Sequence, residues 1–249
     1  MGGHSHWAGI KHKKAITDSK RGKVWTRIVR EITIAVRLGG GDAGSNPRLR
    51  KAIDDAKAAN MPADNVKRAI QRGTGELPGV TYEELTYEGY APAGVAVLIE
   101  ATTDSRNPTS SELRSIFQKG GGNMGESGCV GWMFHAKGVI SVPRSAVSSE
   151  DELMGVILDL GAEDLKSEGD FFEISTQPAD LEKVKAGLES RKIAVESAEV
   201  SMVPENRVPL SEADAARVLK LIETLEENDD VKNVYSNFDI PEAVLAKLS

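Results

Sequence analysis

The sequence predicts an α+β multidomain fold: a helical N-terminal domain followed by two α+β domains, one of them ferredoxin-like and inserted in the other. Three observations predict it. Apolar residues recur at helical spacing through 23–72, strands and helices follow the order βαββαβ over 138–203, and the strands of 82–134 form an incomplete sheet. The expected domains are 1–80, 81–136 together with 204–249, and 137–203.

The helical domain is predicted from three segments. In 23–38, "KVWTRIVREITIAVRL", a spacing of 100° per residue places apolar side chains such as Trp25 on one face and cations on the other. Asn46 is a good N-cap and Pro47 suits a first turn, so a second helix is expected over 47–60. A third is expected over 63–72, ending at Gly73 as its C′ residue.

The second domain begins with strand patterns at Tyr82. "YEELTYEGY" and "GVAVLIEATTD" flank "APAG", which predicts a hairpin. "TSSE" at 109–112 predicts a capping box that opens a helix, 119–128 is expected to be a flexible loop, and "CVGWMF" at 129–134 is expected to be a strand. A helix from Ser211, a strand "DVKNVYSNF" and a short terminal helix need a sheet to lie on, and the sheet of 82–134 can supply it.

The ferredoxin-like domain has the clearest pattern. Strands are expected at 138–143, on both sides of "GD" at 169–170, and at 194–203. Helices are expected at 148–161 and 178–191, the first ending in glycine and the second starting with Pro178. An RNA-recognition motif would carry a basic and aromatic signature on its third strand. That strand is "DFFEIST" here, so its phenylalanines are expected to pack in the core.

Charge is divided unevenly along the 249 residues, which carry a formal net charge of −7. Residues 1–80 hold 16 Lys and Arg against 7 Asp and Glu, and residues 81–249 hold 15 against 31. The first part can therefore approach polyanions, whereas the rest repels them. The longest apolar stretch, "GVAVLI", is too short to span a membrane, and no secretory signal is visible. A single cysteine favours the reducing cytoplasm.

Metal binding and catalysis are both weakly supported. His4, His6 and His12 lie close together in the chain, but a structural zinc site usually needs four ligands. Cys129 and His135 would lie on one strand, about 20 Å apart, which is too far for proton transfer. No nucleophile elbow, zinc-protease, Walker A or dinucleotide motif is present. We therefore expect no enzyme activity, no catalytic residue, no metal and no cofactor.

Polyanion binding is the chemistry that the first 80 residues favour. Clusters of Lys and Arg neutralise phosphates and release counterions. The second and third helices also resemble a helix-turn-helix pair, in which basic residues of the third helix would be auxiliary, although that helix is short for sequence readout. The expected nucleic-acid-binding residues are Lys11, His12, Lys13, Lys14, Lys20, Arg21, Lys23, Arg27, Arg30, Lys67, Arg68 and Arg72. Trp7 could stack on a base, and Trp25 is expected in the core.

Long segments of the chain closely resemble the YebC/PmpR family. They are "GHSHWAGIKHKKAITDSKRGKVWTRIVREI", "NPRLRKAIDDAKAANMPADNVKRAIQRGTG", "YEGYAPAGVAVLIE", "GGGNMGESG" and "DDVKNVYSNFDI". The resemblance implies a non-enzymatic protein of three domains, usually described as a probable DNA-binding transcriptional regulator. Relatives include a mitochondrial activator of cytochrome c oxidase translation and ribosome-associated factors that help translation through proline-rich stretches. His6 and Pro108 depart from the family pattern.

The leading hypothesis is a cytoplasmic, nucleic-acid-binding gene-expression factor, and specifically a DNA-binding transcriptional regulator. Two alternatives stay open: a ribosome-associated translation factor that binds ribosomal RNA, and a protein-interaction module without nucleic-acid binding. Phosphate contacts do not distinguish DNA from RNA. The acidic α+β domains could contact a protein partner, and no membrane partner is expected. A loop contact is also possible at Gly120, Gly121, Gly122, Asn123, Met124, Gly125 and Glu126.

Overall fold

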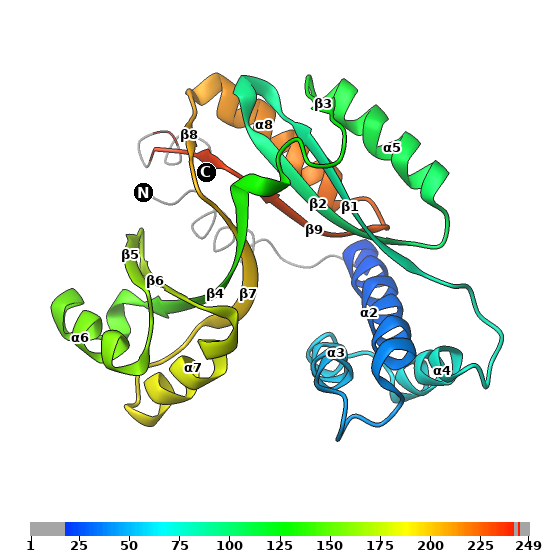
Figure 1. The fold of residues 1–249 in the computed structure, drawn as a ribbon, viewed down its shortest axis with the longest axis horizontal. Helices are drawn as coiled ribbons and strands as arrows, with labels where there is room; N and C mark the ends of the chain where they lie inside the picture. The colour runs from blue at the N-terminus through cyan, green and yellow to red at the C-terminus, as the bar shows by residue number, and fades with distance from the viewer. Residues whose placement is uncertain (1–17, 242–243, 245–249) are drawn as a thin grey trace.

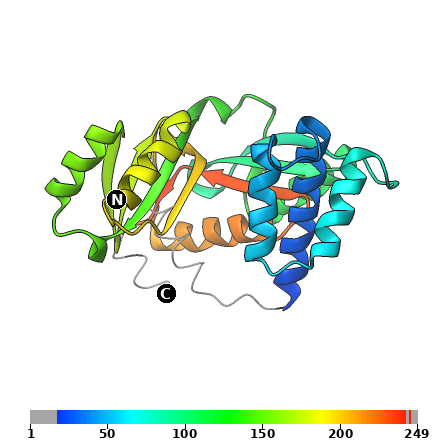
Figure 2. The ribbon, with the colours of Figure 1, turned by 90° about the horizontal axis from the view of Figure 1, so that it is seen from below.

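A computed structural model describes residues 18–241 and residue 244, without the side chains of residues 18–21 and 168. Figure 1 shows three lobes, and in the view of Figure 2 the helical domain overlaps the central one. The helical domain and the ferredoxin-like domain are attached to different sides of a central α+β domain. The α+β multidomain fold class is therefore confirmed.

The helical domain consists of α2 (Asp18–Gly39), α3 (Pro47–Ala58) and α4 (Ala63–Thr74). Its core is formed by the apolar faces of all three helices, including Ile32, Leu49 and Ala69. Trp25 packs against that core, as expected. Asn46 caps α3 by accepting the Leu49 N–H at 3.0 Å, and its amide also donates to two carbonyls at the end of α2.

The expected end of the third helix was wrong by two residues. Gly73 lies inside α4, where an added Cβ would come within 2.7 Å of Val36 Cβ and 2.9 Å of the Thr33 carbonyl. Glycine is needed there because α2 and α4 pack so closely, and not because the helix ends. Thr74 is the last residue of α4, and the chain then turns at Gly75, whose φ is +83°.

The central domain is built on a four-stranded antiparallel sheet in the order β3-β1-β2-β9. The hairpin strands β1 (Glu83–Tyr90) and β2 (Ala96–Thr103) are joined through the 3₁₀ turn Pro92–Gly94. Strand β9 (Val231–Ser236) pairs with β2, and β3 (Asn123–Met124) pairs with β1. The helices α5 (Arg106–Lys119) and α8 (Glu212–Glu226) share a hydrophobic core with the sheet.

Two expected elements of this domain were wrong. The helix that was predicted to open at the "TSSE" capping box begins three residues earlier, at Arg106, and Thr109 is a buried position within it. Residues 129–134 are not one strand, because 131–133 form a 3₁₀ turn and β4 begins at Phe134. A short parallel pair, β8 (Val208–Pro209) with β10 (Phe238–Asp239), completes the domain.

The third domain shows the predicted βαββαβ order. Its sheet has the order β5-β6-β4-β7, and its apolar face, with Ile140, Phe172 and Ile174, packs against two helices. Ser149 caps the first helix and Gly161 ends it in the left-handed conformation. The elements are β4 (Phe134–Pro143), 3₁₀ Arg144–Ala146, α6 (Glu150–Leu160), β5 (Asp164–Glu168), β6 (Phe171–Thr176), 3₁₀ Pro178–Asp180, α7 (Leu181–Ser190) and β7 (Ser197–Pro204).

No helix in the described part of the chain is long and apolar enough to cross a membrane.

Candidate nucleic-acid interface

Half of the expected phosphate contacts cannot be placed. Lys11, His12, Lys13 and Lys14 lie outside the described residues. Lys20 and Arg21 belong to the first turns of α2, but their side chains are also outside the description. The contacts in this segment therefore stay predictions.

The next three cations of α2 point toward the central domain. They contact the α8–β9 turn, which is the segment 226–230 between the end of α8 and the start of β9. Lys23 Nζ donates to the Glu227 carbonyl at 2.7 Å. Arg27 Nη2 donates to the carbonyls of Glu226 and Asn228, the latter at 3.2 Å. Carbonyls at the end of a helix lack partners within the helix and carry the negative end of its dipole. This basic face of α2 therefore caps the C-terminus of α8.

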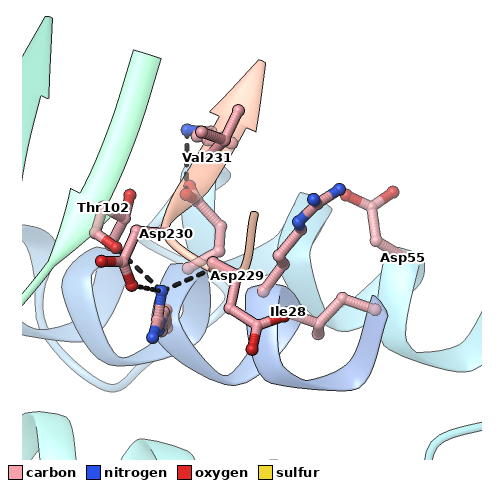
Figure 3. Close-up of a pocket in the computed structure, with 10 residues that line it drawn as sticks. Ile28, Asp55, Thr102, Asp229, Asp230 and Val231 are labelled. Carbon is pink, nitrogen blue, oxygen red and sulfur yellow. Dashed lines mark hydrogen bonds and ion pairs between the residues drawn. The ribbon is translucent and has the colours of Figure 1, made fainter. Parts of the chain in front are cut away.

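Arg30 makes the densest set of contacts at this junction. Its Nη1 donates to the Asp229 carbonyl at 2.7 Å, to the Thr102 carbonyl at 3.0 Å and to Asp230 Oδ1 at 2.7 Å. Its guanidinium also lies over the Tyr82 ring, 5.5 Å from the centroid. The side chains of Arg30 and Asp230 are 15% and 20% exposed, so this ion pair is largely shielded from solvent. Figure 3 shows Thr102, Asp229 and Asp230 gathered beside α2.

Burial at the junction has a cost for the arginines. Desolvation lowers the pKa of Arg27, against the opposing effect of the nearby carboxylates of Glu226 and Asp229. The Nε atoms of Arg27 and Arg30 are buried, and neither has a hydrogen-bond partner among the described residues. A cavity of about 160 Å³ lies between α2, α3 and the β9 strand, and its lining includes both arginines. The docked arginines are therefore incompletely satisfied.

A second ionic cluster lies beside the first. Arg48 Nε donates to Glu31 at 2.6 Å, and Arg48 Nη2 donates to Glu84 at 2.6 Å. Lys232 adds a contact to Glu31 at 2.9 Å. Burial works to raise the pKa of Glu31, but the hydrogen bonds from Arg48 and Lys232 outweigh it, so that the pKa lies below its usual value. This cluster links α2 and α3 to β1 and β9.

The expected auxiliary residues lie on a different surface. Lys67, Arg68 and Arg72 are exposed on α4. Arg68 bonds only near its own position, to Asn65 Oδ1 at 2.6 Å and the Asp64 carbonyl at 3.3 Å. The side chains of Lys67 and Arg72 have no hydrogen bond or ion pair with any residue that the structure describes. The α4 face is therefore open to a phosphate backbone. Its basic side chains could bind phosphates without first breaking contacts to another domain.

The glycine-rich loop is packed against the central domain rather than extended. A Cβ at Gly122 would come within 2.5 Å of the Tyr90 carbonyl, and one at Gly120 within 2.7 Å of Leu221. Residues 123–124 add a strand to the sheet. Close packing thus explains these glycines, and a flexible loop was the wrong expectation. A ligand contact by Gly120–Glu126 stays a prediction; Asn123 and Glu126 are exposed there.

The turn that follows this loop is held by a buried carboxylate. Glu88 on β1 accepts the backbone N–H groups of Gly128, Val130 and Gly131 at 2.6–2.7 Å. Burial works to raise the pKa of Glu88, and the three donors outweigh that effect and lower it. A satisfied, ionised carboxylate of this kind has a structural role.

The described residues offer little support for catalysis. Cys129 lies in the turn before β4, so the premise that it shares a strand with His135 was wrong. Burial raises the pKa of the Cys129 thiol, which disfavours the nucleophilic thiolate. Within residues 18–241 and 244, no group of three His, Cys, Asp or Glu side chains is placed to hold a metal ion. His4, His6 and His12 are outside the description.

The helical wheel missed the acceptors on the partner domain. It separated Lys23, Arg27 and Arg30 from the apolar face but could not show that they meet the α8–β9 turn. The acidic sequence "EENDD" at 226–230 was the available signal, because a run of like charge at a helix end suits a basic helix face. No comparable sequence pattern indicates the second ionic cluster, which is formed by Glu31, Arg48, Glu84 and Lys232.

The structure defines a class of α+β proteins in which a basic helical domain docks through its charged side chains onto a larger acidic part. Comparison with known proteins gives the family. The family models described as TACO1/YebC protein N-terminal domain and TACO1/YebC second and third domain match residues 5–76 and 82–238. The chain belongs to the TACO1/YebC family.

Relatives are similar over the full length of the chain. A probable transcriptional regulatory protein from Chlorobaculum tepidum is 55% identical, over 100% of this chain and 99% of its own. One of the same description from Elusimicrobium minutum is 52% identical, over 100% of both chains. The crystal structure of a conserved hypothetical protein from Aquifex aeolicus is 50% identical and covers 95% of this chain and 98% of its own, with a TM-score of 0.81.

Proposed function

We propose that this protein is a non-enzymatic, DNA-binding transcriptional regulator of the cytoplasm, with its helical domain as the nucleic-acid-binding part. The observation that carries the proposal is the segregation of charge, with 16 Lys and Arg against 7 Asp and Glu in residues 1–80 of an acidic protein. Such a basic domain supplies the sequence-independent part of nucleic-acid affinity. The relatives described as probable transcriptional regulatory proteins support the choice of DNA.

The proposed contact surface has two parts. The first is the N-terminal basic segment that contains Lys11, His12, Lys13, Lys14, Lys20 and Arg21. The second is the open face of α4 with Lys67, Arg68 and Arg72. Lys23 is exposed but bonded to the Glu227 carbonyl, and Arg27 and Arg30 would contact phosphates only when α2 leaves the α8–β9 turn. The acidic domains would keep the polymer on the helical side of the molecule.

Binding to a 20-base-pair duplex, measured by fluorescence anisotropy between 50 and 200 mM salt, tests the proposal. If six phosphates are contacted, affinity should fall by roughly a thousandfold across that range. Changing Lys13, Lys14 and Arg21 together to glutamate should abolish binding at 200 mM salt. Weak binding to DNA even at 50 mM salt would contradict the proposal.

The choice of polymer needs a separate measurement, because phosphate contacts do not identify it. An RNA strand and an RNA hairpin serve as the comparison, followed by cross-linking in cells and sequencing of the bound nucleic acid. Recovery of promoter DNA supports a transcriptional regulator. Recovery of ribosomal RNA replaces that conclusion with a ribosome-associated factor, and recovery of neither favours a protein-interaction module.

A further inference from the structure

The basic face of α2 has two competing sets of acceptors. Lys23, Arg27 and Arg30 lie at i, i+4 and i+7 and therefore on one side of the helix. In this structure their N–H groups bond to the carbonyls of residues 226–229, to the Thr102 carbonyl and to Asp230. An N–H group that donates to these acceptors is not available to a phosphate. Arg27 and Arg30 are also partly buried at this junction, whereas Lys23 is exposed. Docking of α2 and phosphate binding by the two arginines thus exclude each other.

The docked arrangement is held mainly by polar contacts. The hydrophobic cluster of the helical domain contains only residues of α2 to α4, and that of the central domain begins at Tyr87, so no hydrophobic cluster among the described residues crosses the junction. The contacts that cross it include the carbonyl hydrogen bonds, the stacking of Arg30 on Tyr82, the pair Arg30–Asp230 and the pairs of Glu84 with Arg48 and Lys232 with Glu31. Salt weakens the more exposed pair of Glu84 with Arg48 and acts less on the shielded pair Arg30–Asp230.

The balance between the two sets of acceptors favours an anionic competitor. Most acceptors at the junction are neutral carbonyls, whereas a phosphate is charged and forms stronger, often bidentate bonds with arginine. Two buried guanidinium Nε atoms have no partner in the docked state. A phosphate backbone can accept hydrogen bonds from these donors. The free energy gained by phosphate binding therefore offsets the free energy lost when α2 leaves the central domain.

We propose that docking of α2 onto the α8–β9 turn is a reversible latch that masks the basic face of the helix, and that the phosphate backbone of DNA opens it. This inference rests on the proposed function and adds a regulatory step to it. In the latched state only the N-terminal segment and α4 engage DNA. Release of the latch adds Arg27 and Arg30 to the interface and frees the donor that Lys23 gives to the Glu227 carbonyl. It also separates the helical domain from the central domain.

Pulsed electron–electron resonance on the full chain measures the latch directly. Nitroxide labels are placed at the exposed positions of Ala58→Cys on α3 and Ala216→Cys on α8, in a Cys129→Ser background. At 50 mM salt the distance distribution should be narrow, and a saturating 20-base-pair DNA duplex should broaden and lengthen it. Raising the salt without DNA should broaden it much less, because the pair Arg30–Asp230 is shielded from solvent.

A matched pair of variants separates the latch from simple charge. Asp230→Asn removes the Arg30 ion pair but can still accept from the Thr109 hydroxyl, and Asp159→Asn makes the same charge change on an exposed position of the third domain. Asp230→Asn should broaden the distance distribution without DNA. It should also bind DNA about fivefold more tightly than Asp159→Asn, because less binding is lost to the closed state. Thermal unfolding checks that both variants fold.

The outcomes separate the latch from the proposed function. DNA that binds without changing the label distance overturns the latch and leaves the DNA-binding proposal in place. Equal behaviour of Asp230→Asn and Asp159→Asn in both measurements also overturns it. If no nucleic acid binds, the proposed function and DNA as the opener both fail, and the label distance in Asp230→Asn shows whether the junction itself opens.

Discussion

The two basic faces of the helical domain have opposite surroundings. On α2, Lys23, Arg27 and Arg30 contact the α8–β9 turn, and the guanidinium groups are largely buried. On α4, Lys67 and Arg72 are exposed and have no ionic partner in the described part of the chain. The comparison shows that a cationic helix face can form a contact between two domains as readily as it can bind a ligand. Which of these two roles a basic helix face has depends on the domain packed opposite to it. The charge pattern of the helix alone does not show which domain that is.

The largest expected effect concerns the open face. Changing Lys67, Arg68 and Arg72 together to glutamate should lower DNA affinity by about a hundredfold, because phosphate contacts are lost and repulsion is added. The free energy of unfolding should change by less than about 0.5 kcal/mol, since these side chains are exposed. Anisotropy titrations and urea unfolding measure the two quantities. Changing Lys183, Lys185 and Arg191 to glutamate makes the same charge change in the third domain, and an equal loss there would remove the special role of α4.

The second effect tests how α4 is held against α2. Gly73→Ala should lower the free energy of unfolding by about 2 kcal/mol, because its Cβ would overlap Val36 and the Thr33 carbonyl. Gly75→Ala is the matched control: nothing lies within 4 Å of its added Cβ, and only its φ of +83° opposes the change. We expect about 1 kcal/mol there. Equal losses, measured by urea unfolding, would contradict the close approach of the two helices.

The third effect compares one arginine from each face. Arg30→Ala should destabilise the protein by about 1.5 kcal/mol, because Asp230 and several carbonyls lose a donor in a largely shielded position. Arg72→Ala should change the free energy of unfolding by less than about 0.5 kcal/mol. Urea unfolding followed by the fluorescence of Trp25, in a background with Trp7 and Trp132 changed to phenylalanine, reads the helical domain. If Arg30→Ala proves as neutral as Arg72→Ala, the docked face contributes no stability.

The smallest effect extends the comparison to a buried anion. Glu88 accepts three backbone N–H groups inside its own domain, whereas Arg30 donates from Nη1 to carbonyls across a junction. Glu88→Gln should cost about 1 kcal/mol at pH 7, since an amide oxygen accepts more weakly than a carboxylate.

The pH dependence of this variant follows from the lowered pKa of Glu88. The folded protein holds the ionised form, so the stabilisation is complete above the unfolded pKa of about 4.3 and is lost as the pH falls through the lower folded value. The difference between wild type and Glu88→Gln, followed by urea unfolding from pH 7 to pH 3, should therefore shrink with acidity. A difference that is constant with pH would show that the charge of Glu88 is not what stabilises the turn.

Much of the fold could be predicted because local patterns carry it. The cap at Asn46, the hairpin around "APAG" and the βαββαβ order each depend on residues close together in the chain. The errors arose where a distant contact decided the role of a residue. Gly73 ends no helix because α2 lies against it, and Thr109 caps no helix because its hydroxyl bonds to Thr103 and Asp230.

The candidate site was less predictable than the fold for the same reason. Residue type and sidedness separated the cations of α2 from its apolar face, and their binding to nucleic acid stays a prediction. The acceptors that Arg30 meets in the fold at Asp229 and Asp230 are about 200 positions further along the chain. The glycines of 120–122 were equally ambiguous, because a mobile loop and a tightly packed one have the same composition. Only the fold shows which backbone atoms approach them.

The sheet of the central domain also fixes an order of assembly. Val97 on β2 pairs with Ser236 on β9, and the whole ferredoxin-like domain lies between these two strands in the chain. During synthesis the inserted domain is complete, and its contacts are local enough to form, before β9 exists. Until β9 has been synthesised, one edge of β2 in the hairpin of β1 and β2 has no strand to pair with. Strand β9, made late in synthesis, therefore completes the central sheet and, with its preceding turn, creates the surface on which α2 docks.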